Sequence, residues 1–254
     1  MRRAIFALSV LAALTSAAEA DELSLGQESI LAAADAGDGL RGTPHVAYGN
    51  GGYLAVWREG FSGEGGRSRI VALMLDAQGK PFDAKPRELA PCRDGFQELP
   101  RVAFGDGQFL VAWQDFRNGE DYDVLAARIA PGNKARDAAP IVVASGPGNQ
   151  AVPDVASDGK NFLVAWQGVQ RDDNGYRIGA AVVAADGRVG EAAEFASPWA
   201  KTGACPKLAW DGRHYRVAFV AQVLLSVRLE SDGALVKEQP AVLRSNLGAA
   251  IGFS

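Results

Sequence analysis

Four polar side chains occupy equivalent positions in the sequence, each directly after a proline. The prolines are spaced 56, 53 and 53 residues apart, and the residues that follow them are His45, Arg101, Asp154 and Lys207. If the four segments fold alike around one axis, these side chains meet at the mouth of a central channel. Their mixed charges could then bind a small polar or sugar-like ligand. Alternatively they satisfy one another or water and plug the opening, because polar groups near a narrow channel need hydrogen-bond partners.

A second group of candidate residues consists of carboxylates crowded into one loop. The group comprises Asp115, Glu120, Asp121 and Asp123. Clustered carboxylates can bind Ca²⁺ through oxygen ligands, although this spacing matches no established calcium motif. Two positioned carboxyl groups are also what glycoside cleavage requires. A solvated acidic loop is the third interpretation, and we expect no metal here.

Other chemistries find little support in the sequence. His45 and His214 are the only histidines, and neither lies near a nucleophile-elbow signature. Because the chain has no Gly-rich phosphate loop and no Cys/His metal spacing, we expect no cofactor. Gln97 and Gln150 each precede a repeat proline by three residues. We expect these two amides to hydrogen-bond the backbone rather than a ligand.

The elements that would position these residues form four copies of one pattern. Each copy begins at a proline, continues as an alternating run, passes an Asn-Gly or Asp-Gly pair and ends in a large aromatic after a second alternating run. The copies are Pro44–Trp57, Pro100–Trp113, Pro153–Trp166 and Pro206–Phe219. Turn pairs of this kind suit short hairpins, and a self-similar period of this length is typical of a propeller blade.

Two further strands are expected after each hairpin. The third strands are expected at 69–75, 123–129, 177–183 and 224–229, and the outer strands at 87–90, 141–144, 193–196 and 241–244. The predicted fold is therefore an all-β propeller of four-stranded antiparallel blades. Four blades match the four copies, with five blades, or a half-ring that dimerises, as alternatives. Ser29–Ala33 is expected either to close the ring as an outer strand or to be a loosely packed leader.

The proline, the turn pair and the aromatic-closed strand together resemble the repeats of secreted bacterial β-propeller proteins. The resemblance covers residues 29–245 and identifies no subfamily, because the repeats lack both the sialidase Asp-box and the marks of intracellular forty-residue repeats. It implies a rigid scaffold that hosts enzymes in some proteins and binding platforms in others. The longer polar loops share one face, which we call the long-loop face, and ligands are expected there.

The N-terminus reads as a secretory signal peptide. Arg2 and Arg3 precede an apolar run from Ala4 to Thr15, and Ala18–Ala20 is a small-x-small cleavage signal. We therefore expect residues 1–20 to be removed, leaving one domain over 21–254 that is secreted or periplasmic. The net charge of −4 argues against nucleic-acid partners. No apolar run is long enough to span a membrane.

The chain contains two cysteines, Cys92 and Cys205. Export permits a disulfide, but one falls after an outer strand and the other before an inner strand, so we expect two free thiols. Taken together, the sequence predicts an exported, non-catalytic binding or scaffold propeller with its ligand at the channel mouth. Its partner would be a small polar ligand, a glycan or a protein. The alternative is a glycan-acting hydrolase that uses loop carboxylates.

Overall fold

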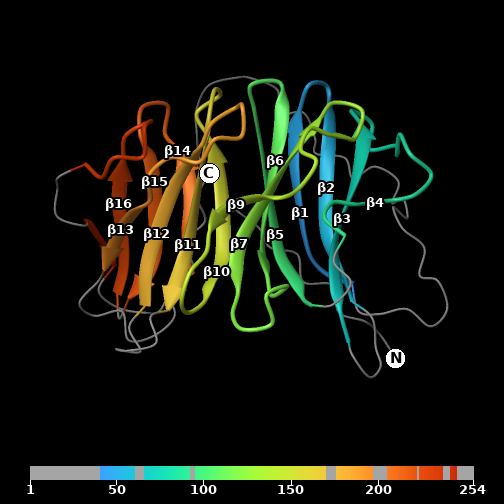
Figure 1. The fold of residues 1–254 in the computed structure, drawn as a ribbon. Coiled ribbons are helices and arrows are strands. Elements are labelled where there is room, and N and C mark those ends of the chain that lie inside the picture. The colour runs from blue at the N-terminus through green and yellow to red at the C-terminus, as the bar shows by residue number, and fades with distance from the viewer. Residues whose placement is uncertain are drawn as a thin grey trace, which may run out of the picture. The chain divides into compact units, whose positions relative to one another are not determined.

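A computed structural model describes residues 41–60, 66–91, 95–169, 176–196, 205–221, 223–236 and 241–244. Within these ranges the chain forms strands, turns and loops, with no helix. The strands form four antiparallel sheets that follow one another in chain order, coloured from blue to red in Figure 1. The predicted all-β fold of antiparallel sheets is thereby confirmed, with four strands in three of the sheets and five in the second.

Each sheet is a meander whose innermost strand comes first in the sequence. The first sheet contains β1 (Arg41–Gly49), β2 (Gly52–Gly60), β3 (Ser68–Asp76) and β4 (Arg87–Glu88). The second contains β5 (Gln97–Gly105), β6 (Gln108–Asp115), β7 (Asp123–Ala130), β8 (Lys134–Ala135) and β9 (Ile141–Ala144), with β9 paired to β7. The third contains β10 (Gln150–Ser157), β11 (Phe162–Val169), β12 (Tyr176–Val183) and β13 (Ala193–Ala196). The fourth contains β14 (Lys207–Trp210), β15 (Tyr215–Ala221), β16 (Val223–Leu229) and β17 (Ala241–Arg244).

The first hairpin of each sheet follows the turn chemistry of the sequence, with one difference. In the first two sheets a two-residue turn with positive φ at both positions joins the strands, at Asn50-Gly51 and Asp106-Gly107. In the third and fourth sheets the loops contain four residues, 158–161 and 211–214. There the aspartate side chain accepts the N–H groups two and three residues later, so the carboxylate organises the longer turn.

A β-bulge precedes the repeat proline in the first three sheets. The register of the first strand pair shifts between Gly42 and His45, between Glu98 and Arg101, and between Ala151 and Asp154. The residue before the proline has positive φ in three repeats, at Leu99 (51°), Val152 (52°) and Cys205 (30°). Residues other than glycine rarely adopt a positive φ. A bulge bends the strand, so it changes the direction of the side chain that follows the proline.

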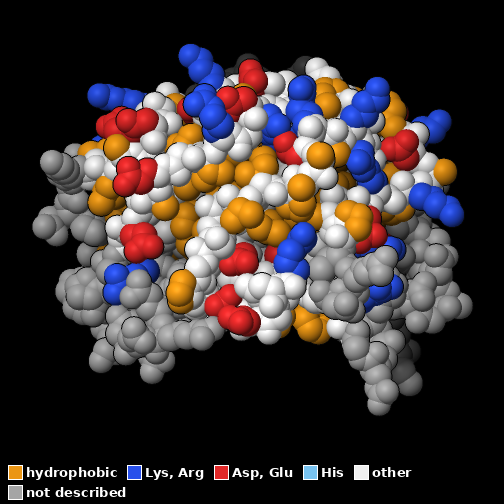
Figure 2. All heavy atoms as spheres, viewed as in Figure 1, with side chains coloured by type: hydrophobic (Ala, Val, Ile, Leu, Met, Phe, Trp, Pro, Cys, Tyr) orange, Lys and Arg blue, Asp and Glu red, His pale blue; other side chains and the backbone are white. Residues whose placement is uncertain are grey.

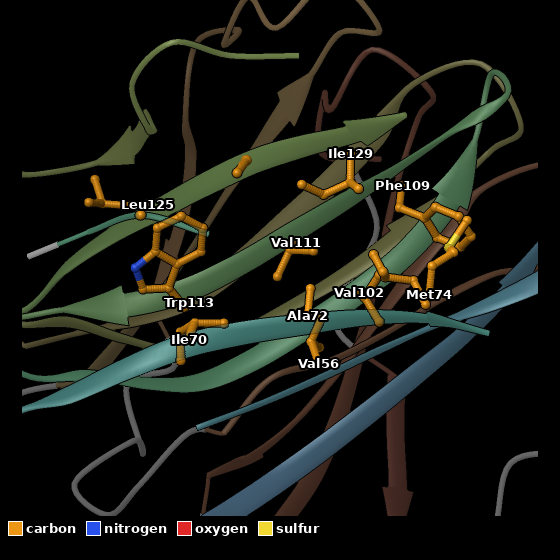
Figure 3. Packing of buried hydrophobic residues seen from close by; sticks show 13 residues of the cluster. Val56, Ile70, Ala72, Met74, Val102, Phe109, Val111, Trp113, Leu125 and Ile129 are labelled. Carbon is orange, nitrogen blue, oxygen red and sulfur yellow. The ribbon is translucent and has the colours of Figure 1, made fainter. Parts of the chain in front are cut away.

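Apolar side chains from neighbouring sheets interdigitate to form the core. Trp113 of β6 is fully buried and belongs to a cluster with Ile70 and Ala72 of the first sheet and Leu125 of its own sheet (Figure 3). Trp113 therefore packs between the first and second sheets. Two further clusters join the second sheet to the third and the third to the fourth.

Gln97 also joins the first two sheets, as the sequence predicts. Its side-chain oxygen accepts the N–H of Ile70 at 3.0 Å, and its amide nitrogen donates to the carbonyl of Ala90 at 2.7 Å. Gln150 likewise donates to the carbonyl of Gly148. Both amides bind backbone, so their repetition is a structural feature of the connectors.

Several expectations fall outside the described residues. These are the signal peptide, the closing strand at Ser29–Ala33, Cys92 and the segment after Arg244. Cys205 is a free thiol. In the part of the chain that the structure describes, no helix is long and apolar enough to cross a membrane.

Candidate active site

A pocket of about 400 Å³ opens beside the loop that joins β6 to β7. Its lining comes from this loop and from residues 145–147, the turn that follows β9. The loop contributes the polar side chains Asn118, Glu120, Asp121 and Asp123. In Figure 2 acidic side chains gather at the lower edge of the view, where Figure 1 places this loop. The pocket therefore lies among the carboxylates that the sequence predicts as candidates.

Two of these carboxylates share one hydrogen-bond donor. Nδ2 of Asn118 donates to Oδ1 of Asp121 at 2.9 Å and to Oδ2 of Asp123 at 3.2 Å. These two oxygens are therefore no more than about 6 Å apart. Asp121 is 7% exposed and also accepts the N–H of Gly148 at 2.9 Å, so its carboxylate is held in place from two sides.

The two carboxyl groups have different electrostatic environments. Burial, and next the negative charge of Asp121, raise the pKa of Asp123 above its ordinary value. Hydrogen bonds from the Gly146 backbone and from Asn118 oppose this shift without cancelling it. Asp123 therefore retains a proton more readily than an ordinary aspartate side chain does.

Asp115, the first carboxylate of the predicted group, has a structural role instead. It is fully buried and accepts hydrogen bonds from Trp113 Nε1 at 2.8 Å and from Gln97 Nε2 at 3.1 Å. The guanidinium of Arg117 adds contacts of 2.8 and 2.6 Å. Asp115 thus fixes the end of β6 and the start of the loop, and it is not among the residues that line the pocket.

Tyr122, the last residue of the β6–β7 loop, is anchored to the start of β5. Its hydroxyl donates to Oε2 of Glu98 at 3.0 Å, and Glu98 also accepts from Gln114 and Arg58. Burial, followed by the charge of Glu98, raises the pKa of Tyr122 to about 12. The phenol therefore stays neutral at physiological pH and donates a hydrogen bond to Glu98. Because Tyr122 stands between Asp121 and Asp123, this anchor holds the backbone that carries both carboxylates.

The structure also brings together the four residues predicted at the channel mouth. Nε of Arg101 lies 3.5 Å from Oδ1 of Asp154. The charges of Arg101, Asp154 and Lys207 all act on the His45 side chain. The charges of side chains from the second, third and fourth sheets therefore act on His45 of the first sheet.

Two members of this group accept hydrogen bonds from the backbone of a neighbouring sheet. Nδ1 of His45 accepts the N–H of Val102 at 3.3 Å, and Oδ2 of Asp154 accepts the N–H of Leu208 at 2.8 Å. In each case a side chain of one sheet binds the inner strand of the next sheet. Binding of a ligand by this group remains a prediction.

No metal ligand set accompanies either group. Among the described residues, no three or more His, Cys, Asp or Glu side chains are arranged to hold a metal ion. At the pocket, two carboxyl groups share the Asn118 side chain as a hydrogen-bond donor.

Comparison with known proteins finds likeness at the level of the fold. No protein-family model matches the chain, and no curated protein matches its sequence. Solved structures do match its fold. An α-L-arabinofuranosidase from Lactobacillus brevis superimposes with a TM-score of 0.53 at 12% identity, covering 82% of this chain and 79% of that chain. The catalytic domain of a GH62 α-L-arabinofuranosidase from Coprinopsis cinerea gives 0.51 at 16% identity, covering 83% and 69%. A β-1,2-mannobiose phosphorylase from Listeria innocua gives 0.56 at 9% identity, covering 84% and 79%.

These likenesses support the propeller-like fold and correct the functional expectation. The sequence predicts a non-catalytic binding or scaffold propeller, and that prediction is wrong: the similar structures are glycan-acting enzymes, which favours the hydrolase alternative. The sequence alone could not show this pocket, because its lining comes from the loop after β6 and the turn after β9, which lie apart in the chain.

Sequence reasoning also missed the residues that bind the two carboxylates and complete the lining of the pocket. Asn118 binds both carboxylates, and residues 145–147 form the opposite wall of the pocket. The only local signal was the Asn118-Gly119 turn, in which Gly119 has φ of 76°. Nothing in the sequence showed that a turn more than twenty residues later would cover the loop.

Proposed function

We propose that the protein is an exported glycosidase that cleaves glycosidic bonds in the pocket beside the β6–β7 loop. Asp123 is the proton donor, and Asp121 is its partner in the reaction. The observation that carries this proposal is the pair itself: two carboxyl groups on one shared donor, one of them with a raised pKa, in an open pocket. A raised pKa on one member of a carboxylate pair is the property expected of a general acid.

The chemistry assigns a separate task to each residue. Asp123, protonated more readily because it is partly buried beside Asp121, protonates the departing glycosidic oxygen. Asp121 is held by Asn118 and Gly148 and faces the sugar carbon from which that oxygen leaves. A separation of about 5–5.5 Å is typical of retaining glycosidases, whereas inverting enzymes need about 6.5–9.5 Å to admit a water. The upper limit of about 6 Å favours a double displacement with Asp121 as nucleophile.

The test is an activity screen with matched variants. The purified protein is incubated with aryl glycosides and with arabinan, mannan and sialylated glycans, and reducing-end release is measured. Asp123→Asn and Asp121→Asn should each lower the rate at least about 100-fold, because both remove a proton-transfer or nucleophilic group. Glu191→Gln, an exposed carboxylate outside the pocket, should leave the rate unchanged. Activity that survives both aspartate changes would place the reaction elsewhere.

Export is the second part of the proposal. It rests on the basic residues, apolar run and small-x-small signal of the N-terminus. Mass spectrometry of the protein recovered from the periplasm or medium should give a mature N-terminus near Asp21. A protein that retains Met1 and stays in the cytoplasm would contradict it.

A further inference from the structure

The group at the channel mouth offers hydrogen-bond donors almost exclusively. The N–H of Val102 donates to Nδ1 of His45 at 3.3 Å, so Nδ1 must be the unprotonated nitrogen of the neutral imidazole. The proton of the ring therefore resides on Nε2. His45 presents an N–H to its surroundings, and its one acceptor is already in use.

Asp154 is the only carboxylate of the group, and both of its oxygens have partners. Oδ2 accepts the N–H of Leu208 at 2.8 Å, and Oδ1 lies 3.5 Å from Nε of Arg101. The residue is 7% exposed. A ligand hydroxyl that needed an acceptor here would have to compete with contacts that also join the third and fourth sheets.

The remaining two residues are cations, and together they outnumber the one carboxylate. Arg101 donates from Nη1 to the carbonyl of Pro100 at 3.0 Å, and its side chain is 16% exposed. Lys207 is exposed. Burial first, and then the charge of Arg101, lower the pKa of His45 despite Asp154, and Lys207 adds to the effect. Positive potential therefore dominates at this point.

We propose that the mouth formed by His45, Arg101 and Lys207 is an anion-binding site for the carboxylate or phosphate group of a small ligand. The three side chains provide an imidazole N–H, a guanidinium fork and an ammonium group. Carboxylates and phosphates are recognised by such donors through charge-assisted hydrogen bonds. A neutral sugar lacks the charge and needs acceptors that this mouth does not provide. The site is distinct from the carboxylate pair of the pocket, and its test measures binding rather than glycosidase activity.

The experiment is isothermal titration of the purified protein at low ionic strength. Three probes are compared: D-galacturonate, inorganic phosphate and the uncharged D-galactose. One or both anions should bind at millimolar concentration or tighter, and at least about tenfold more tightly than galactose. The binding should weaken with added NaCl, because salt screens the charges. Binding of galacturonate alone identifies a carboxylate site, and binding of phosphate alone or of both identifies a broader anion site. Galactose binding equal to that of the anions, or no anion binding, overturns the proposal.

Variants separate this site from a structural plug. Arg101→Gln should weaken anion binding about tenfold and Lys207→Gln about threefold or more, since each removes one cation. Asp154→Asn should tighten it severalfold, because the amide oxygen can still accept the Leu208 N–H while the opposing charge is gone. Lys160→Gln, an exposed lysine in the β10–β11 hairpin, is the control and should change nothing. Since Lys207 is exposed, its variant keeps the test decisive if Arg101→Gln is unstable. Weaker binding in Asp154→Asn together with no effect of Lys207→Gln contradicts the proposal.

Discussion

At the scale of single residues, hydrogen-bond partners decide which polar groups are structural. Asp115 and Asp123 stand eight residues apart in one acidic stretch, and the sequence offers no reason to separate them. In the structure Asp115 is fully buried among donors, whereas Asp123 lines a pocket beside another carboxylate. Only contacts between distant segments create that difference. The sequence therefore identified the candidate carboxylates, but it could not predict which of them is buried and which lines a pocket.

His45 gives a prediction about pH at this scale. Its pKa lies below the ordinary 6.5 in the folded protein, whereas in the unfolded chain it returns to that value. The unfolded state then binds more protons below pH 6.5, so acidification costs stability through this residue. His45→Asn keeps an acceptor for Val102 and removes the titration. We expect the free energy of unfolding to fall less between pH 7 and pH 5 in this variant than in the native protein.

Denaturant melts at several pH values provide the measurement. As the pH falls, the free energy of unfolding of the variant should increase relative to that of the native protein. Parallel curves would show that His45 does not resist protonation in the fold, and would remove the evidence that Arg101 and Lys207 act on it.

At the scale of elements, alternation and turn residues predicted the strands closely. The expected third strand at 123–129 is observed at Asp123–Ala130, and the expected outer strand at 141–144 is observed at Ile141–Ala144. Local signals suffice there because side-chain periodicity and turn φ values are properties of a few adjacent residues. The short strand β8 and the bulges with positive φ at Leu99 and Val152 were missed. Such features are set by the packing of neighbouring sheets.

Trp113 tests the packing between sheets. Trp113→Ala should destabilise the protein by about 3–5 kcal/mol, the range for truncating a buried aromatic side chain. The indole is fully buried between the first two sheets and donates to Asp115, so truncation leaves a cavity and removes one of the donors to this carboxylate. Phe82→Ala is the matched control, because Phe82 is 63% exposed. Its cost should stay below about 1 kcal/mol in the same denaturant melt. A comparably small loss for Trp113→Ala would mean that the first two sheets do not depend on it.

At the scale of the described chain, four copies of a sequence pattern became four sheets joined by equivalent contacts. His45 binds the inner strand of the second sheet, and Asp154 binds that of the fourth, through the side chain that follows the repeat proline. The repeat period predicted this equivalence. It could not predict function, because the pocket breaks the repeat: it combines the β6–β7 loop with the turn after β9.

The most direct test of the account follows the anomeric protons by NMR while the protein cleaves its best substrate from the screen. With Asp121 and Asp123 held by one asparagine, no more than about 6 Å apart, the first sugar released should keep the anomeric configuration of the substrate. Asp123→Asn should abolish the new signals. A first product of inverted configuration, or cleavage that proceeds normally in Asp123→Asn, would contradict the central claim that this carboxylate pair performs the reaction.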